Sequence, residues 1–184
     1  MDIVKVVRNW VKKNYTGDKH LIRAEYWLHK LKPEADKAMV IAVISHDIER
    51  VFHKGRKPPS PDVGGAKWDD QEYNLWHGKR SASFVEKFLL ENGFSDRNKI
   101  SKIKRLITYH EIGGDKEQDL IKDTDSVSFF ENNINLFLSW IPEKATKQGI
   151  KEKFNYMYNR IASKKAKDLA RPYYLKALEK LELV

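Results

Sequence analysis

A histidine and an aspartate stand side by side, as His46-Asp47, at the end of an almost continuous apolar run that begins at Ala38. Imidazole nitrogens and carboxylate oxygens are good ligands for divalent cations, and the apolar run predicts that the pair lies in a dry interior. A polar pair satisfied within a core is the plain alternative, because buried polar groups merely need partners. The choice depends on four further residues, which are His20, His77, His110 and Asp125.

The sequence lacks the motifs of other common kinds of catalytic site. The chain has no cysteine, so a thiolate nucleophile or a thiolate metal site is excluded, and any metal must be held by histidine and carboxylate. It also carries neither a phosphate-binding P-loop, nor a dinucleotide-binding glycine fingerprint, nor a Gly-x-Ser-x-Gly elbow. The residues therefore favour metal chemistry over nucleophilic catalysis by a side chain.

Helical periodicity dominates the elements that would position these residues. Apolar side chains recur at offsets of three and four, and no alternating stretch is long enough to build a sheet. We predict an all-α bundle of about seven or eight helices. The expected helices cover about 2–14, 18–31, 33–51, 68–93, 96–110, 119–141, 144–161 and 164–183, with Arg171-Pro172 kinking or interrupting the last one.

The same periodicity places the candidate ligands. His20 falls near the start of its helix, His77 shares an inward face with Ser81, and His110 follows the buried Ile107 by three positions. Asp125 is expected near the beginning of a helix, where capping is the alternative role for it and for Asp123. Groups on facing helices of a bundle can build a metal centre in its interior.

Length and composition favour one domain. The chain has 184 residues, 41% of them hydrophobic, and no linker divides it, so we expect a single domain over 1–184 with a motif-bearing core at about 18–140. No apolar stretch approaches the roughly 20 residues that span a bilayer, and no leader is evident. A cytoplasmic protein without membrane partners is the expectation.

Positive charge gathers in two places. Residues 142–184, the expected C-terminal basic helices, carry eleven Lys and Arg against five acidic residues, and residues 53–67 carry four against one. The basic tail could bind nucleic acid, but a solvated lysine-rich face is more common. The second segment is rich in proline and glycine and should form an irregular loop, of a length that is often a lid or a binding loop, with a disordered excursion without function as the plain alternative. Its cations are candidates for substrate phosphate: Lys54, Arg56, Lys57 and Lys67.

The ordered series His, His-Asp, His, His, Asp resembles the HD-domain superfamily of metal-dependent phosphohydrolases. The resemblance runs from about His20 to Phe130 and rests on five segments: HLIR, SHDIER, HGKRSASFVEKFLLENG, ITYHE and DTDSVSFFE. One departure is that the family often has Gly-Lys after His-Asp-Ile, whereas this chain has Glu49-Arg50. Arg50 keeps the positive charge and can bind two phosphate oxygens.

The resemblance implies a ligand set. In the superfamily the residues matching His20, His46, Asp47 and Asp125 hold one divalent ion. In members with both middle histidines, those matching His77 and His110 complete a second site, and the carboxylate matching Asp47 bridges the two ions. One or two divalent ions are therefore expected, with Mn, Fe, Mg, Ni, Co and Zn all open.

The implied activity is hydrolysis of a phosphorylated small molecule, expected to be a nucleotide. A water held by a divalent ion has a lowered pKa and attacks phosphorus as hydroxide. Asp47, Arg50 and Arg23 are the expected catalytic residues, and Arg23 and Arg50 lead the phosphate-binding candidates because helical spacing fixes their side. Two alternatives stay open, which are a di-iron HD-type oxygenase and a non-catalytic, metal-stabilised module that binds nucleic acid through the basic tail.

Overall fold

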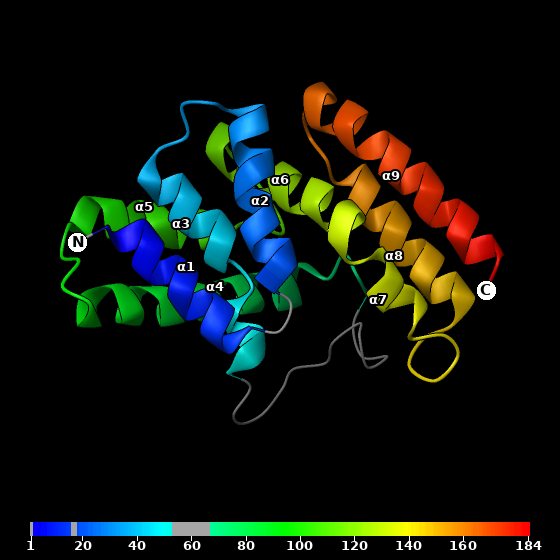
Figure 1. Cartoon of the computed structure of the whole chain (residues 1–184), viewed down its shortest axis with the longest axis horizontal. Helices are drawn as coiled ribbons and strands as arrows, with labels where there is room; N and C mark the ends of the chain where they lie inside the picture. The colour runs from blue at the N-terminus through cyan, green and yellow to red at the C-terminus, as the bar shows by residue number, and fades with distance from the viewer. Residues whose placement is uncertain (1, 16–17, 53–66) are drawn as a thin grey trace.

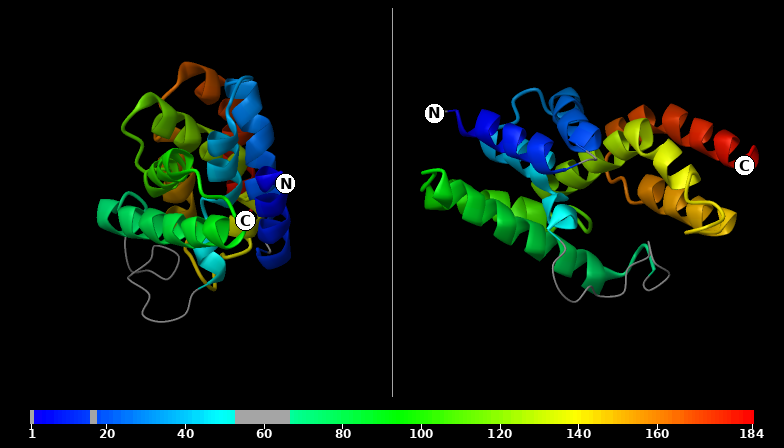
Figure 2. Two further views of the ribbon diagram at one scale, coloured as in Figure 1. Left: turned by 90° about the vertical axis from the view of Figure 1, so that its left-hand side faces the viewer. Right: turned by 60° about the horizontal axis from the view of Figure 1, so that its bottom comes forward.

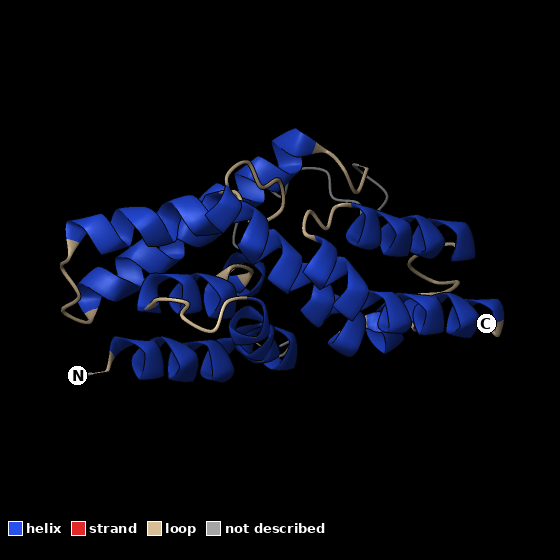
Figure 3. Cartoon of the chain, turned by 90° about the horizontal axis from the view of Figure 1, so that it is seen from above, coloured by secondary structure: helices blue, strands red, loops and turns tan. Residues whose placement is uncertain are grey.

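The computed structural model describes residues 2–15, 18–52 and 67–184, and helices make up all of its regular structure there (Figure 3). The prediction of an all-α bundle is confirmed. Nine α-helices and one short 3₁₀ helix lie in the described ranges: α1 (Ile3–Asn14), α2 (Asp18–Leu31), α3 (Lys37–Ser45), η1 (Ile48–Val51), α4 (Gln71–Glu91), α5 (Arg97–Thr108), α6 (Lys116–Asn132), α7 (Ile134–Leu138), α8 (Lys147–Asn159) and α9 (Lys164–Glu182).

Two clusters of buried side chains form the interior, and α6 belongs to both (Figure 1). The first core takes its side chains from α1 to α5 and from Ile121 on α6. The second core takes them from α7, α8 and α9, from Trp27 of α2, and from Val127, Phe129 and Phe130 further along α6. Other views show the same division, with α8 and α9 at the end opposite α4 and α5 (Figure 2). Helix α6 therefore connects the two cores.

Two helix boundaries near the candidate ligands differ from the sequence-based expectation. The helix expected to run to about Val51 ends at Ser45, so that His46 and Asp47 lie in a turn before η1. Helix α6 begins at Lys116, because Asp115 and Gln118 form a capping box there. Asp125 is therefore an interior helical residue, and the alternative that it or Asp123 is an N-cap is wrong.

Two further features of the helices are relevant. Helix α9 continues through Pro172, so the alternative that Arg171-Pro172 interrupts the helix is wrong, whereas a kink there stays a prediction. Asp123 accepts hydrogen bonds from the backbone N–H groups of Ala162 and Ser163, at 2.7 and 2.9 Å, and so fixes the turn between α8 and α9. Within the described ranges, no helix is both long and apolar enough to cross a membrane.

Helices α4 and α5 approach each other closely at Gly78. A Cβ atom at this position would lie only 2.2 Å from the backbone oxygen of Thr108. Only glycine fits such an approach of two backbones. Gly78 follows His77, and Thr108 lies two residues before His110, so the contact brings these two histidines together.

Candidate metal centre

Two clusters of buried metal-ligating groups lie where the two cores meet. His20, His46 and Asp125 form one, called here the His20 cluster, and Asp47, His77, His110 and Glu111 form the other, called the His77 cluster. Within each cluster the donor atoms lie within 4.8 Å of one another. The groups come from α2, α4, α6 and the turns after α3 and α5. The structure thus brings all six expected ligands together, and adds Glu111.

In both clusters the Nε2 atoms of two histidines converge on one carboxylate oxygen. In the His20 cluster, Oδ1 of Asp125 lies 2.9 Å from His20 and 3.3 Å from His46. In the His77 cluster, Oδ1 of Asp47 lies 2.7 Å from His77 and 3.7 Å from His110. By the distances between donor atoms, Asp47 belongs to the His77 cluster alone. The expectation that Asp47 bridges two metal ions stays a prediction.

The two clusters adjoin through their imidazole rings. The ring centroid of His46 lies 5.5 Å from that of His20 and 4.8 Å from that of His110, and the His110 and His77 centroids are 5.2 Å apart. Nε2 of His46 and Nε2 of His110 are buried, and apart from the carboxylate oxygens at 3.3 and 3.7 Å they have no hydrogen-bond partner among the described residues. A buried nitrogen without a hydrogen bond is costly unless something else binds it. The donor set and these two atoms fit a divalent cation.

Each histidine is oriented through its other ring nitrogen. Nδ1 of His46 lies 2.8 Å from the backbone oxygen of Val43, and Nδ1 of His110 lies 2.7 Å from that of Ile107. A carbonyl oxygen accepts only, so both Nδ1 atoms carry the proton and leave Nε2 to act as a ligand. Nδ1 of His20 lies 3.1 Å from Oγ of Ser128. Nδ1 of His77 has a carboxylate partner, Oε1 of Glu49, at 2.7 Å.

Opposite charges shift the pKa values within the site. Burial opposes protonation of His46, but the carboxylates of Asp125 and Asp47 outweigh it and raise its pKa to about 9, so a cation that binds Nε2 of His46 would displace a proton from it. Burial also opposes ionisation of Asp47 and Asp125, yet the pKa of each stays well below its usual range, because Arg50 lies beside Asp47 and Arg160 beside Asp125. Both carboxylates are therefore anionic at neutral pH and able to bind a cation.

Sequence reasoning missed Arg160 and Glu111, two charged residues that lie beside the expected ligands. The Arg160 guanidinium, just beyond α8, pairs with Glu111 and Asp125, and its Nε lies 2.9 Å from Oγ of Ser126. Burial opposes ionisation of Glu111, but Arg160 outweighs it and lowers its pKa to about 2. Glu111 directly follows His110 in the ITYHE stretch, so its position beside an expected ligand could have marked it as a further ligand candidate. Nothing local marks Arg160, which lies beyond the segment that resembles the HD superfamily.

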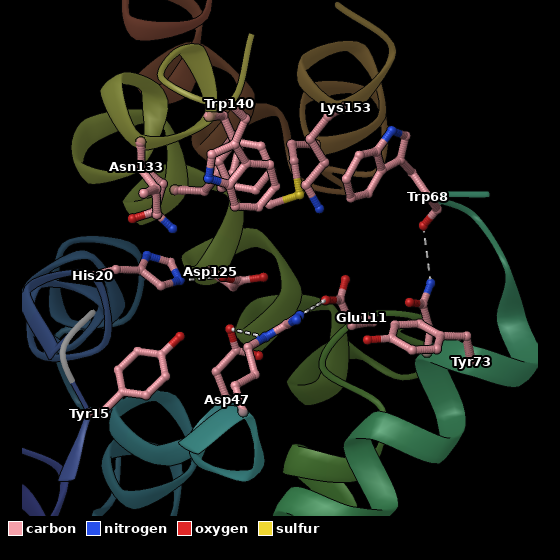
Figure 4. Close-up of a pocket in the computed structure, with 16 residues that line it drawn as sticks. Tyr15, His20, Asp47, Trp68, Tyr73, Glu111, Asp125, Asn133, Trp140 and Lys153 are labelled. Atoms are coloured by element: carbon pink, nitrogen blue, oxygen red, sulfur yellow. Dashed lines mark hydrogen bonds and ion pairs between the residues drawn. The ribbon is translucent and has the colours of Figure 1, made fainter. Parts of the chain in front are cut away.

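A pocket of about 200 Å³ opens over the clusters (Figure 4). His20, Asp47, Glu111 and Asp125 lie on one side of it, and Trp68, Trp140 and Lys153 lie on the other. Arg50 also lines the pocket, with its Nε 3.0 Å from Oδ2 of Asp47. The pocket thus joins the metal-ligating groups to two cations and an aromatic wall.

Not every expected phosphate-binding cation lies there. Nε of Arg23 donates to Oε2 of Glu131 at 2.7 Å, the guanidinium stacks on Tyr26, and Arg23 does not line the pocket. The expectation that Arg23 faces the site is corrected accordingly. Lys67 is exposed and also does not line the pocket. The remaining candidates, Lys54, Arg56 and Lys57, fall outside the described residues.

Comparison with known protein families places the chain in one family. Residues 8–180 match the family described as "Domain of unknown function (DUF4202)", and the chain belongs to that family. The match includes every ligand candidate as well as Arg160. No curated protein and no solved structure matches the chain.

Proposed function

We propose that this protein is a metal-dependent phosphohydrolase, similar to members of the HD-domain superfamily, that acts on a phosphorylated small molecule. One observation carries the proposal: the two adjoining clusters contribute one imidazole, that of His20, and all three of their carboxylates to a pocket that also holds Arg50 and Lys153. Metal ligands alone would suit a structural ion as well. Cations beside an open metal centre suit an anionic substrate in particular.

The ligands have distinct tasks in this proposal. His20, His46 and Asp125 would hold one ion, and Asp47, His77, His110 and Glu111 would hold another. A divalent ion there supplies Lewis acidity and lowers the pKa of a water molecule that it binds. The backbone oxygens of Val43 and Ile107 keep His46 and His110 in the tautomer that presents Nε2 to the centre.

The pocket residues would bind the rest of the substrate. The Arg50 guanidinium can bind two phosphate oxygens, and its present partners, Oδ2 of Asp47 at 3.0 Å and Oε1 of Glu111 at 4.0 Å, keep it at the edge of the centre. Nζ of Lys153 lies 4.6 Å from the centroid of the Trp68 ring, so a cation and an aromatic face are presented together. This combination suits a phosphate attached to a planar group, as in a nucleotide.

A screen for phosphate release tests the proposal. Nucleoside mono-, di- and triphosphates and cyclic nucleotides would be incubated with protein loaded with Mn²⁺, Mg²⁺, Co²⁺, Ni²⁺, Zn²⁺ or Fe²⁺. We expect at least one metal-dependent release that Asp47→Ala abolishes and that the exposed Asp69→Ala leaves unchanged. Absence of release with every metal would contradict the proposal, and oxygen uptake by the iron-loaded protein would favour the di-iron oxygenase instead.

Arg50 has a separate test on the best substrate. Arg50→Ala should leave bound metal in place and lower kcat/KM by about 10- to 150-fold, the equivalent of roughly 1.5 to 3 kcal/mol for a lost charged hydrogen bond. Arg97→Ala, on the exposed first turn of α5, is the matched control. An Arg50→Ala protein that loses its metal would show that Arg50 supports the centre and not the substrate.

A further inference from the structure

The two clusters differ in the donors that they offer. The His77 cluster provides four groups, two imidazoles and two carboxylates, whereas the His20 cluster provides three, with Asp125 as its only carboxylate. Glu111 is the additional group of the His77 cluster, and its Oε1 lies 3.7 Å from Nε2 of His110. Charge and number of ligands both raise the affinity of a site for a divalent cation. By donor count, the His77 cluster is the stronger site.

The arginines mainly contact the outer carboxylate oxygens, although a guanidinium nitrogen of Arg50 also lies 4.0 Å from Oε1 of Glu111. Arg50 contacts Oδ2 of Asp47, while Oδ1 faces His77 and His110. Arg160 pairs with Oε2 of Glu111 and with Oδ2 of Asp125, so it affects both clusters alike. The inward oxygens therefore number two in the His77 cluster and one in the His20 cluster. The His77 cluster therefore keeps the larger number of donor groups, although Arg50 offsets one of its negative charges.

Glu49 adds a second difference. Its side chain is completely buried, and Oε1 lies 2.7 Å from Nδ1 of His77, whereas the other three histidines have neutral Nδ1 partners. Its Oε2 lies 3.4 Å from Nε of Arg80, a partly exposed residue one turn along α4 from His77. A carboxylate behind a ligating histidine fixes the ring and raises its basicity, and loss of such a partner typically lowers metal affinity about 10- to 100-fold.

We propose that the His77 cluster is the tighter of two metal sites and fills first, with Glu111 as its fourth ligand and Glu49 as the residue that orients His77. The inference rests on the metal centre of the proposed function and deepens it. It assigns to Glu49, at the position where the HD superfamily often has glycine, a positioning role through His77.

Calorimetric titration of chelator-treated, full-length protein with Mn²⁺ tests the order of filling. The wild type should bind two equivalents of unequal affinity, His77→Ala should lose the tighter one, and His20→Ala should lose the weaker one. The opposite assignment would overturn the inference, as would a wild type that binds no Mn²⁺. A single equivalent that is lost in His77→Ala and kept in His20→Ala would support it.

The same titration tests the two glutamates. Glu49→Gln should weaken the tighter equivalent about 10- to 100-fold and leave the weaker one unchanged, and Glu111→Gln should weaken the same equivalent. Glu86→Gln, also on α4 but paired with Lys104 away from the clusters, is the control. If both variants fold and both Glu49→Gln and Glu111→Gln bind Mn²⁺ with unchanged affinity, the assignment is overturned. If the protein releases phosphate but the His20 cluster fills first, this inference fails and the proposed function stands. If the His77 cluster fills first but no substrate releases phosphate, the inference stands and the proposed function fails.

Discussion

Arg160 connects the C-terminal part of the chain to both clusters of candidate ligands. Only 6% of its side chain is exposed, and it pairs with Glu111 of the His77 cluster and Asp125 of the His20 cluster. Burial opposes its charge, yet the two carboxylates raise the pKa of the guanidinium further above its ordinary value. Removing one partner of a buried ion pair leaves an uncompensated charge, which typically costs about 3 to 5 kcal/mol.

Arg160→Met should therefore lower the free energy of unfolding by roughly 3 to 5 kcal/mol in the presence of a chelator. With saturating Mn²⁺ the loss should be smaller, because a bound cation would neutralise the same two carboxylates. Urea unfolding under both conditions measures the difference, and Arg171→Met, an exposed residue of α9, is the control. Equal losses with and without Mn²⁺ would show that Arg160 has no connection to the metal.

Individual ligands could be predicted because each lies on a face that its own helix defines. His110 follows the buried Leu106 and Ile107 by four and three positions, whereas His77 shares its face with the buried Ser81; both histidines are fully buried. Helical spacing could not reveal that Glu131 on α6 takes up Arg23, because that partner lies 108 residues away. Arg160 was missed for the same physical reason, since a buried arginine depends on carboxylates that only the tertiary fold supplies.

The crossing of α4 and α5 depends on a single missing side chain. A Cβ at Gly78 would lie 2.2 Å from the Thr108 oxygen, a backbone atom that cannot move aside without shifting α5. Separation of the two helices would also separate His77 from His110. The geometry of the His77 cluster thus depends on Gly78, although this residue carries no ligand.

Gly78→Ala should lower the free energy of unfolding by roughly 1 to 3 kcal/mol, since overpacking outweighs the gain in helix propensity. It should also weaken the Mn²⁺ equivalent bound by the His77 cluster. Gly149→Ala on α8 is the matched control, because its Cβ would lie 3.3 Å from Oγ1 of Thr146, and its stability should change by less than about 1 kcal/mol. A Gly78→Ala protein as stable as the wild type, with unchanged Mn²⁺ affinity, would contradict this account.

Helix type was easier to predict from the sequence than helix ends. The periodicity of α4, α5 and α9 placed them within a few residues of their observed bounds. The start of α6 was missed although Asp115 and Gln118 have the spacing of a capping box, and this error made Asp125 resemble a cap. The apolar run toward Val51 concealed the turn at His46-Asp47, where Nδ1 of His46 bonds to the backbone oxygen of Val43.

In the whole molecule, the centre lies between two hydrophobic cores that share α6. His46, His77 and His110 come from the side of the first core, and Arg160 comes from the helices of the second. Cations bound at both clusters would hold α2, α4, α6 and the turns after α3 and α5 together. The expectation of a single domain over 1–184 stays a prediction.

Metal should consequently stabilise the whole fold. Free Mn²⁺ at about 100 times its dissociation constant should raise the free energy of unfolding by roughly 2.7 kcal/mol for each site that only the folded chain provides. Thermal and urea unfolding with Mn²⁺ and with chelator measure this gain, which His46→Ala should reduce. If Mn²⁺ leaves the unfolding of the wild type unchanged, the clusters do not bind it.

The most direct test of the metal centre is anomalous X-ray diffraction from crystals of the full chain grown with saturating Mn²⁺. We predict an anomalous difference peak among Asp47, His77, His110 and Glu111, and a second peak among His20, His46 and Asp125. At limiting Mn²⁺ the first peak should be the stronger. Crystals that diffract well at saturating Mn²⁺ but show no anomalous peak at either cluster would contradict the account.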